Sequence, residues 1–139
     1  NQDCIIMTAA VSDYRIKNYS EQKIKKSDDE GITLELVKNP DILKEICEIK
    51  NASSSESKEN MPVIVGFCAE SENLIENAKK KIQKKGCDFL VANDISRKDI
   101  GFNSDENEVY LLDKDLNIKH VEKDTKQNIA KRILEEIFE

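Results

Sequence analysis

The stretch PVIVGFCAESENLIENAKKKIQKKGCDFLVAND, residues 62–94, contains two kinds of hydrophobic pattern and decides the fold class. Residues 62–67 and 88–94 are short and almost continuously apolar, which is typical of strands that are buried on both faces. The segment between them predicts a helix with Ser71 as its cap and Gly86 as its C-terminal stop. A strand, a helix and a second buried strand predict a parallel sheet that is covered by helices on both faces.

The rest of the chain extends this α/β pattern. Asn39 is expected to cap a helix that has Pro40 at its first helical position. The other expected elements are strands over 5–10 and 32–37, loops over 11–31 and 51–61, a hairpin of 108–112 and 116–121, and a final helix over 125–138 with Ile129, Ile133, Leu134 and Ile137 on one face. The pattern predicts one domain over residues 1–139, a Rossmann-like, mostly parallel sheet flanked by helices, with a C-terminal β-hairpin.

Composition and charge narrow the function classes. The 139 residues are 38% hydrophobic and 36% charged, with a formal net charge of −6. This charge opposes general affinity for nucleic acids or anionic membranes, so an anion site has to be local. No stretch approaches the roughly 20 apolar residues of a membrane span, and no secretory leader is visible. We therefore expect a cytoplasmic protein with neither a nucleic-acid nor a membrane partner.

The cysteines and the histidine offer little for metal or acid–base chemistry. Cys4, Cys47, Cys68 and Cys87 lie far apart in the sequence and form no CxxC pair. Their apolar neighbours favour buried, reduced thiols. His120 lies in an alternating strand pattern, where a structural role is the more common one.

Three stretches follow the predicted buried strands and should share one rim of the sheet: Ala9–Asp13, Gly66–Glu70 and Ala92–Asp94. Ligands of such sheets bind at the carboxyl ends of the strands. The small residues Ala9 and Ala10 would let a ligand approach the backbone, although packing of two alanines against a helix explains them equally well.

Positive charge could complete an anion site. Lys81 and Lys85 share a helix face, but lysines in the last turns of a helix are also favoured simply by its dipole. Lys23, Lys25 and Lys26 lie in a predicted loop, and we expect residues 15–30 to be a poorly ordered cationic lid when no ligand is bound. The sequence contains no GxGxxG or Walker loop.

Six motifs in order resemble one known family. They are TAAVSDYR, KIKK, LELVKNPDIL, VGFCAES, KKGCDFLVAND and GFNSDENEVYLL. Together they are similar, in order and spacing, to the phosphopantothenoylcysteine synthetase family, also called phosphopantothenate–cysteine ligase. The resemblance runs from Ile5 to about Leu112.

The resemblance implies an enzyme of coenzyme A synthesis. In the bacterial family, CTP activates the carboxylate of 4′-phosphopantothenate as an acyl-cytidylate and pyrophosphate leaves. The amine of cysteine then attacks to give the amide and CMP. Magnesium would share the neutralisation of the triphosphate. FMN is implied only if a flavin-dependent decarboxylase domain is fused upstream.

The resemblance also implies which residues would act in catalysis, in dimer formation and in nucleotide binding. The lid lysine of the family corresponds to Lys23, which would stabilise the charge that gathers during attack. The family's homodimer strand region corresponds to Ile32–Val37, and the first part of the family's domain would lie before Asn1. The nucleotide pocket would comprise Ala9, Ala10, Asp13, Lys23, Pro40, Asp41, Ile42, Leu43, Phe67, Lys81 and Lys85.

Two further function classes stay open on the residues alone. A non-catalytic nucleotide-binding module on a Rossmann-like sheet would need the pocket but not the lid. An NAD(P)-dependent oxidoreductase is disfavoured, because the glycine fingerprint is missing.

Overall fold

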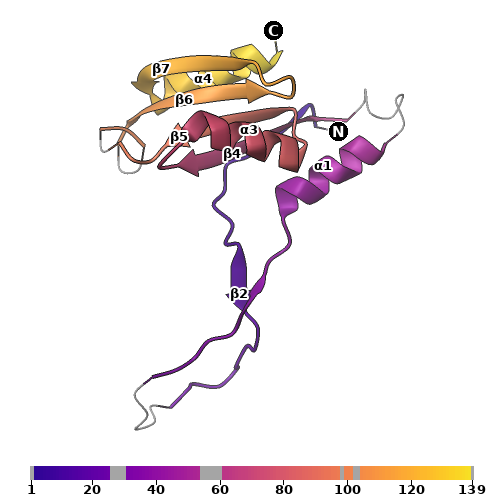
Figure 1. Ribbon diagram of the computed structural model, residues 1–139, viewed down its shortest axis with the longest axis vertical. Coiled ribbons are helices and arrows are strands. Elements are labelled where there is room, and N and C mark those ends of the chain that lie inside the picture. Colours follow the sequence, from indigo (N-terminus) through magenta and orange to yellow (C-terminus); the bar gives the residue numbers. More distant parts are fainter. Residues whose placement is uncertain (1, 26–30, 54–60, 98, 102–103, 139) are drawn as a thin grey trace.

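The computed structural model describes residues 2–25, 31–53, 61–97, 99–101 and 104–138. Figure 1 shows a sheet with flanking helices, from which a long, thin arm projects. In chain order the elements are β1 (Cys4–Met7), β2 (Tyr14–Ile16), β3 (Leu36–Lys38), α1 (Ile42–Ala52), β4 (Val63–Glu70), α3 (Leu74–Lys85), β5 (Phe89–Asp94), β6 (Glu106–Asp113), β7 (Ile118–Thr125) and α4 (Lys126–Phe138).

Five strands form the main sheet in the order β1-β4-β5-β6-β7. β1, β4 and β5 are parallel, β6 runs antiparallel to β5, and β7 runs antiparallel to β6, with which it forms a hairpin. Glu70 is in register with Asp94, so β4 and β5 end together, whereas Met7 at the end of β1 is in register with Gly66 in the middle of β4. The Rossmann-like α/β fold with a C-terminal hairpin is confirmed.

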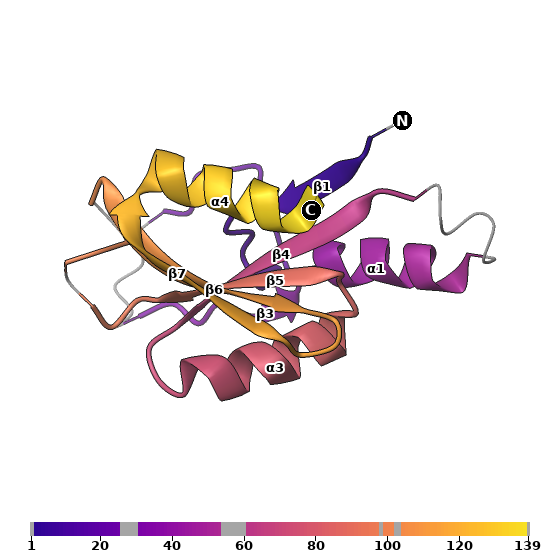
Figure 2. The ribbon, with the colours of Figure 1, turned by 90° about the horizontal axis from the view of Figure 1, so that it is seen from above.

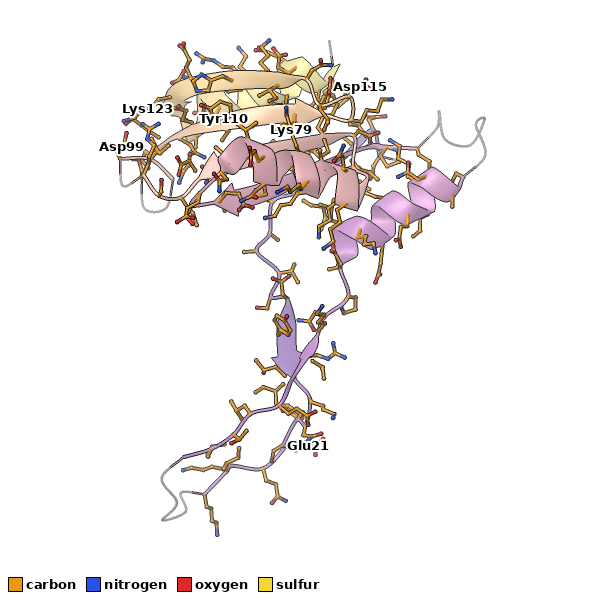
Figure 3. All side chains as sticks on the ribbon, viewed as in Figure 1. Glu21, Lys79, Asp99, Tyr110, Asp115 and Lys123 are labelled. Carbon is orange, nitrogen blue, oxygen red and sulfur yellow. The ribbon has the colours of Figure 1, made fainter. Side chains whose placement is uncertain are left out.

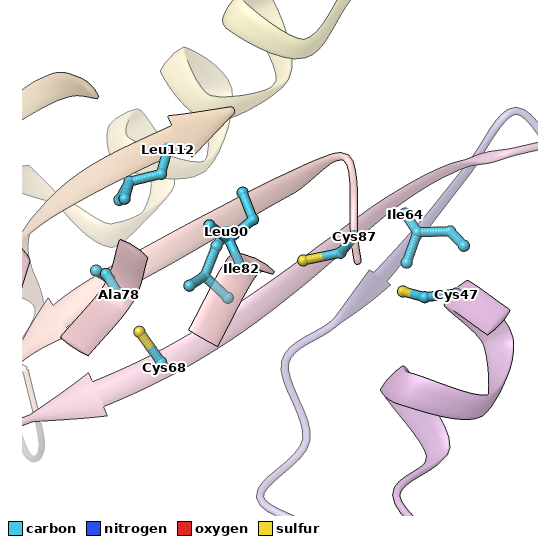
Figure 4. Close-up of a cluster of buried hydrophobic side chains, with 9 residues drawn as sticks. Cys47, Ile64, Cys68, Ala78, Ile82, Cys87, Leu90 and Leu112 are labelled. Carbon is cyan, nitrogen blue, oxygen red and sulfur yellow. The ribbon is translucent and has the colours of Figure 1, made fainter. Parts of the chain in front are cut away.

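Helices cover both faces of this sheet (Figure 2). α1 and α3 pack on one face and α4 on the other. Successive residues of β4 show why its sequence is continuously apolar, because Ile64 joins the α1 and α3 layer and Val65 joins the α4 layer. Figure 4 shows the first layer, which contains Cys47, Ile64, Cys68, Ala78, Ile82, Cys87, Leu90, Ala92 and Leu112.

The arm is a separate two-stranded antiparallel ribbon of β2 and β3. The prediction of an uninterrupted loop over 11–31 was wrong, because Tyr14–Ile16 pair with β3. The prediction of a strand over 32–37 was also wrong, because β3 spans only Leu36–Lys38. Within the described residues, no sheet packs against the apolar side of the alternating pattern that suggested a longer strand, and Ile32, Leu34 and Leu36 are exposed.

Large apolar side chains are exposed along the arm and its root. Tyr19 is 86% exposed and Ile32 is 67% exposed. The others on this segment are Val11, Tyr14, Ile16, Ile24, Leu34 and Leu36. An isolated two-stranded ribbon is marginally stable in water, and exposed apolar patches of this kind are typical of interaction surfaces.

Two predicted helix caps differ from the structure. α1 is capped by Asp41 rather than by Asn39, because the Asn39 side chain bonds to the base of the arm, and Pro40 therefore precedes the helix. α3 begins after Asn73, which has left-handed backbone angles and makes no side-chain cap, so Ser71 lies before the helix in a bend. Gly86 ends α3 as predicted.

Other elements begin or end differently from the prediction. β1 ends at Met7, because the chain leaves the sheet there to enter the arm. Leu134 is 42% exposed although Ile129 and Ile133 on the same helix are buried. Cys4 is half-buried, and the other three cysteines are buried.

Lys26, most of the predicted 51–61 loop and part of the predicted 15–30 lid lie outside the described residues.

None of the helices in the described ranges combines the length and the apolar character that a membrane crossing requires.

Candidate functional site

A cavity of about 360 Å³ lies where the arm joins the sheet. Five segments line it: the end of β1 with the chain that follows, the start of α1 with the residues just before it, strand β4, strand β5, and the last turns of α3. Its lining residues are Met7, Ala9, Val11, Ser12, Asp13, Asn39, Pro40, Asp41, Ile42, Leu43, Phe67, Lys81, Lys84, Lys85 and Leu90.

This cavity gathers most of the predicted nucleotide-pocket residues, although they come from segments far apart in the chain. Ala10 and Lys23 are not among the lining residues. Those that line it are Ala9, Asp13, Pro40, Asp41, Ile42, Leu43, Phe67, Lys81 and Lys85.

Asn39 holds the two chains at the root of the arm together. Its Nδ2 donates to the Ser12 carbonyl oxygen at 2.7 Å, and its backbone N–H donates to the Asp13 carbonyl oxygen at 2.8 Å. Arg15 Nη1 donates to Asn39 Oδ1 at 3.0 Å. These bonds fix the Ser12–Asp13 wall against the start of α1.

Asp41 links the two helices at the pocket. Its Oδ1 caps α1 by accepting a hydrogen bond from the Lys44 backbone N–H at 3.1 Å, and its Oδ2 pairs with the Lys85 ammonium of α3. Partial burial alone would raise the pKa of Asp41, but the bonds from Lys85 and Lys44 outweigh it and hold that pKa below its usual value.

Glu70 holds α3 from the end of β4. Its Oε1 contacts the Lys81 ammonium, and its Oε2 accepts a hydrogen bond from Asn77 Nδ2 at 3.1 Å. Asn77 lies one turn before Lys81 on α3. Oε1 is fully buried, and within the described part of the chain it accepts no well-directed hydrogen bond, so the Lys81 charge is its main compensation.

Lys23 lies on the arm and not at the cavity. Figure 3 labels Glu21, two residues earlier, on the arm at a distance from the sheet. The structure therefore does not bring the predicted lid lysine to the other predicted site residues.

Sequence reasoning missed several lining residues. Lys84 lies between Lys81 and Lys85 in the sequence KKKIQKK, and this position was the only indication that it could line the same pocket. Asn39 was interpreted as a helix cap, and only its partners Ser12 and Arg15 reveal its role at the arm. Met7, Val11 and Leu90 carry no signal beyond apolarity.

The predicted rim of three strand exits is divided between two cavities. Asp94 lines a second cavity of about 430 Å³ together with Asn73, Arg97, Glu108 and Tyr110. His120 lies beside this group, because its Nε2 is 2.9 Å from Glu108 Oε1 and its ring stacks on Tyr110.

The buried thiols stay protonated at neutral pH. Burial raises the pKa of Cys68 to about 11 and that of Cys87 to about 12. Among the described residues, no group of three or more His, Cys, Asp and Glu side chains is arranged to hold a metal ion.

The comparison with known proteins covers the whole chain. The family described as DNA/pantothenate metabolism flavoprotein C-terminal domain matches residues 1–139. The chain belongs to this family. Membership agrees with the resemblance read from the six motifs.

This flavoprotein C-terminal domain matches only a part of each of its longer relatives. The coenzyme A biosynthesis bifunctional protein CoaBC of Haemophilus influenzae is 40% identical over 94% of this chain and 30% of its own length. The CoaBC protein of Escherichia coli is 36% identical over 98% of this chain and 32% of its own length. The chain thus spans about a third of the length of these relatives.

Two solved structures share the fold. The C-terminal domain of a CoaBC protein is 30% identical, with a TM-score of 0.67, and the match covers 97% of this chain and 53% of that one. A DNA/pantothenate metabolism flavoprotein from Streptococcus pneumoniae gives a TM-score of 0.69 at 22% identity, over 97% of this chain and 62% of that one.

Proposed function

We propose that this chain forms the nucleotide-binding part of a coenzyme A biosynthesis enzyme, a CTP-dependent phosphopantothenate–cysteine ligase. The observation that supports it best is the single cavity that gathers Ala9, Asp13, Phe67, Lys81, Lys85 and the residues from Pro40 to Leu43. Family membership and the CoaBC relatives agree with this assignment.

The charges around the cavity suit a reaction between two anions. An oxygen of the phosphopantothenate carboxylate attacks the α-phosphorus of CTP, and the bond to pyrophosphate breaks. The cysteine amine then attacks the acyl carbon, CMP leaves, and the amine loses a proton. Lys81, Lys84 and Lys85 line the cavity and would attract the triphosphate, because cations lower this barrier where negative charge gathers.

Magnesium would be coordinated mainly by the triphosphate rather than by protein side chains alone. Mg²⁺ is commonly bound through substrate phosphates and one or two carboxylates. Asp13 and Asp41 are the carboxylates that line the cavity, and Asp41 already pairs with Lys85. Asp13 is therefore the residue that would hold the ion, which would neutralise phosphate charge.

We further propose that the arm forms a homodimer with a second copy of the chain. The apolar side chains that are exposed between Val11 and Leu36 support this, because a two-stranded ribbon that buries so little apolar surface is only marginally stable by itself. Lys23 would then reach a cavity through movement of the arm or through the partner's arm. The enzyme would work in the cytoplasm on small-molecule substrates.

A non-catalytic nucleotide-binding module remains the second candidate. The observation in its favour is that Lys23 lies away from the cavity. Such a module would bind CTP but would not need the arm for chemistry.

Nucleotide-dependent thermal stability of the natural full-length protein tests the proposal. CTP with Mg²⁺ should raise the melting temperature more than ATP or GTP does, because a ligand that binds only the native state stabilises it. Lys81→Met should reduce the shift, whereas Lys79→Met, on the same helix but away from the lining, should retain it. Identical curves for the three nucleotides would remove CTP from the proposal.

A further inference from the structure

The two lysines of α3 that the resemblance assigns to the nucleotide pocket already have carboxylate partners in the structure. Lys85 pairs with Asp41, and Lys81 pairs with Glu70. All but Glu70 line the cavity. A phosphate that enters has to share these two ammonium groups with the carboxylates or displace the carboxylates from them.

The two carboxylates differ in how readily they can lose a partner. The Asp41 side chain is 40% exposed, so water can solvate it after Lys85 leaves. The Glu70 side chain is only 16% exposed, and its Oε1 is fully buried. A buried charge without a partner is costly, which favours retention of the Glu70–Lys81 pair.

The two pairs also differ in what else holds the carboxylate. Asp41 also accepts a hydrogen bond from the Lys44 backbone N–H through Oδ1, the oxygen that does not pair with Lys85. Glu70 is tied to Asn77 and Lys81, one turn apart on the same helix. The Glu70–Lys81 pair therefore belongs to the packing of α3 on β4, whereas the Asp41–Lys85 pair bridges the cavity from α1 to α3.

We propose that Asp41 is an exchangeable counterion of Lys85. When a ligand phosphate binds, the Lys85 ammonium leaves Asp41 and pairs with the phosphate, whereas the Lys81 ammonium stays with Glu70 and is shared between Glu70 and the phosphate. The inference rests on the proposed function only in taking a polyphosphate as the ligand. Asp41 is then a positioning residue that holds Lys85 at the cavity and competes with the ligand for it.

Asp41→Asn separates this role from the helix cap. Asparagine is as good a cap as aspartate, so α1 keeps its start, but the variant has no charge with which to hold Lys85. A lysine that is released from a partly exposed ion pair binds phosphate without breaking that pair. We expect inorganic tripolyphosphate to bind the variant about fivefold more tightly.

The test is calorimetric titration of tripolyphosphate into the natural full-length protein and its variants. Glu48→Gln is the matched control, because Glu48 pairs with Lys44 on the exposed side of α1 and its loss changes the net charge equally. Glu48→Gln should leave the dissociation constant within about twofold. Glu70→Gln should tighten binding less than Asp41→Asn does, because no ion pair has to break when phosphate shares Lys81 with Glu70.

A double-variant cycle attributes the gain to the pair. When Lys85 is replaced by Met, adding Asp41→Asn should change the dissociation constant by less than about twofold, because the exchanged cation is gone. A gain that persists without Lys85, or an equal gain in Glu70→Gln or Glu48→Gln, would overturn the proposed exchange. Unfolding curves of Asp41→Asn that match those of wild type would exclude loss of the helix cap as the cause.

The outcomes separate this inference from the proposed function. Unchanged or weaker tripolyphosphate binding by Asp41→Asn, or no binding by any variant, overturns the exchange, although selective stabilisation by CTP would still support the ligase. Tighter binding by Asp41→Asn together with equal stabilisation by CTP, ATP and GTP supports the exchange and contradicts the choice of CTP.

Discussion

Lys50 and Asp88 form an ion pair that ties α1 to the turn between α3 and β5. Lys50 Nζ donates to Asp88 Oδ2 at 2.6 Å and to the Pro62 carbonyl oxygen at 2.9 Å. The same Asp88 oxygen accepts the Ile64 backbone N–H at 2.7 Å. Lys50 is a buried residue, so its charge depends on these few partners.

Asp88→Asn should lower the free energy of unfolding by about 3 kcal/mol, because it leaves a buried ammonium without its counter-charge. Denaturant unfolding of the variant and wild type measures this difference. Glu135→Gln, which removes an exposed pair with Lys131, should change stability by less than about 1 kcal/mol. Equal effects of the two variants would contradict the structural role of the Lys50–Asp88 pair.

Lys23→Ala tests the proposed lid lysine. The release of pyrophosphate that depends on CTP and phosphopantothenate, measured without cysteine, should fall about a hundredfold, which is the scale for loss of one preorganised charge stabiliser. Omission of cysteine isolates acyl-cytidylate formation.

Folding should be unaffected by Lys23→Ala, because Lys23 is exposed on the arm and surface substitutions usually stay within about 0.5 kcal/mol. Pyrophosphate release equal to that of wild type would make Lys23 an ordinary solvated lysine. It would also favour the non-catalytic nucleotide-binding module.

At the scale of elements, Gly66 sets how closely α1 lies on β4. A Cβ added at Gly66 would be 2.6 Å from Leu43 Cδ2 and 3.2 Å from Leu90 Cδ1. Leu43 and Leu90 both line the cavity. The missing side chain therefore connects the packing of a strand with the shape of the site.

Gly66→Ala should lower stability by about 1–2 kcal/mol, because the extra methyl group forces Leu43 to move in a packed layer. It should also weaken CTP-dependent stabilisation, since Leu43 lies in the first turn of α1. Thermal unfolding with and without CTP measures both effects. Gly31→Ala is the control, because nothing in the described part of the chain lies within 4 Å of its added Cβ, and it should leave the CTP effect unchanged.

At the scale of the whole molecule, the arm leaves large apolar side chains exposed in the described chain. Ile16 and Leu36 are in register across the ribbon, and both are about half exposed. A second copy would bury these side chains. The proposed homodimer therefore accounts for an arm that a monomer would leave in water.

Leu36→Glu should convert the dimer to a monomer, because it places a charge on the apolar side of the ribbon. Sedimentation velocity of the full-length protein at micromolar concentration measures the change. Thr33→Glu adds the same charge at a polar position of the alternating run and should leave the dimer intact. A monomeric wild type would contradict the proposed role of the arm.

The sequence alone determined the layered fold. Residues 62–67 and 88–94 are almost continuously apolar because their strands have a helix layer on each face, and the local hydrophobic pattern reflects this burial directly. Gly86 ends α3 because its backbone adopts left-handed angles that glycine tolerates. The family motifs also named most of the residues that line the cavity.

Only the tertiary structure decided which polar side chains meet. Asn39 reads as a helix cap but bonds to Ser12 and Arg15, and Asp41, which reads as part of the first turn, becomes the cap. Asp41 and Lys85 form their pair across 44 positions of sequence. The reason is physical, because burial of an element is reflected in the spacing of apolar residues along the chain. An ion pair depends on distances that exist only after the helices pack on the sheet.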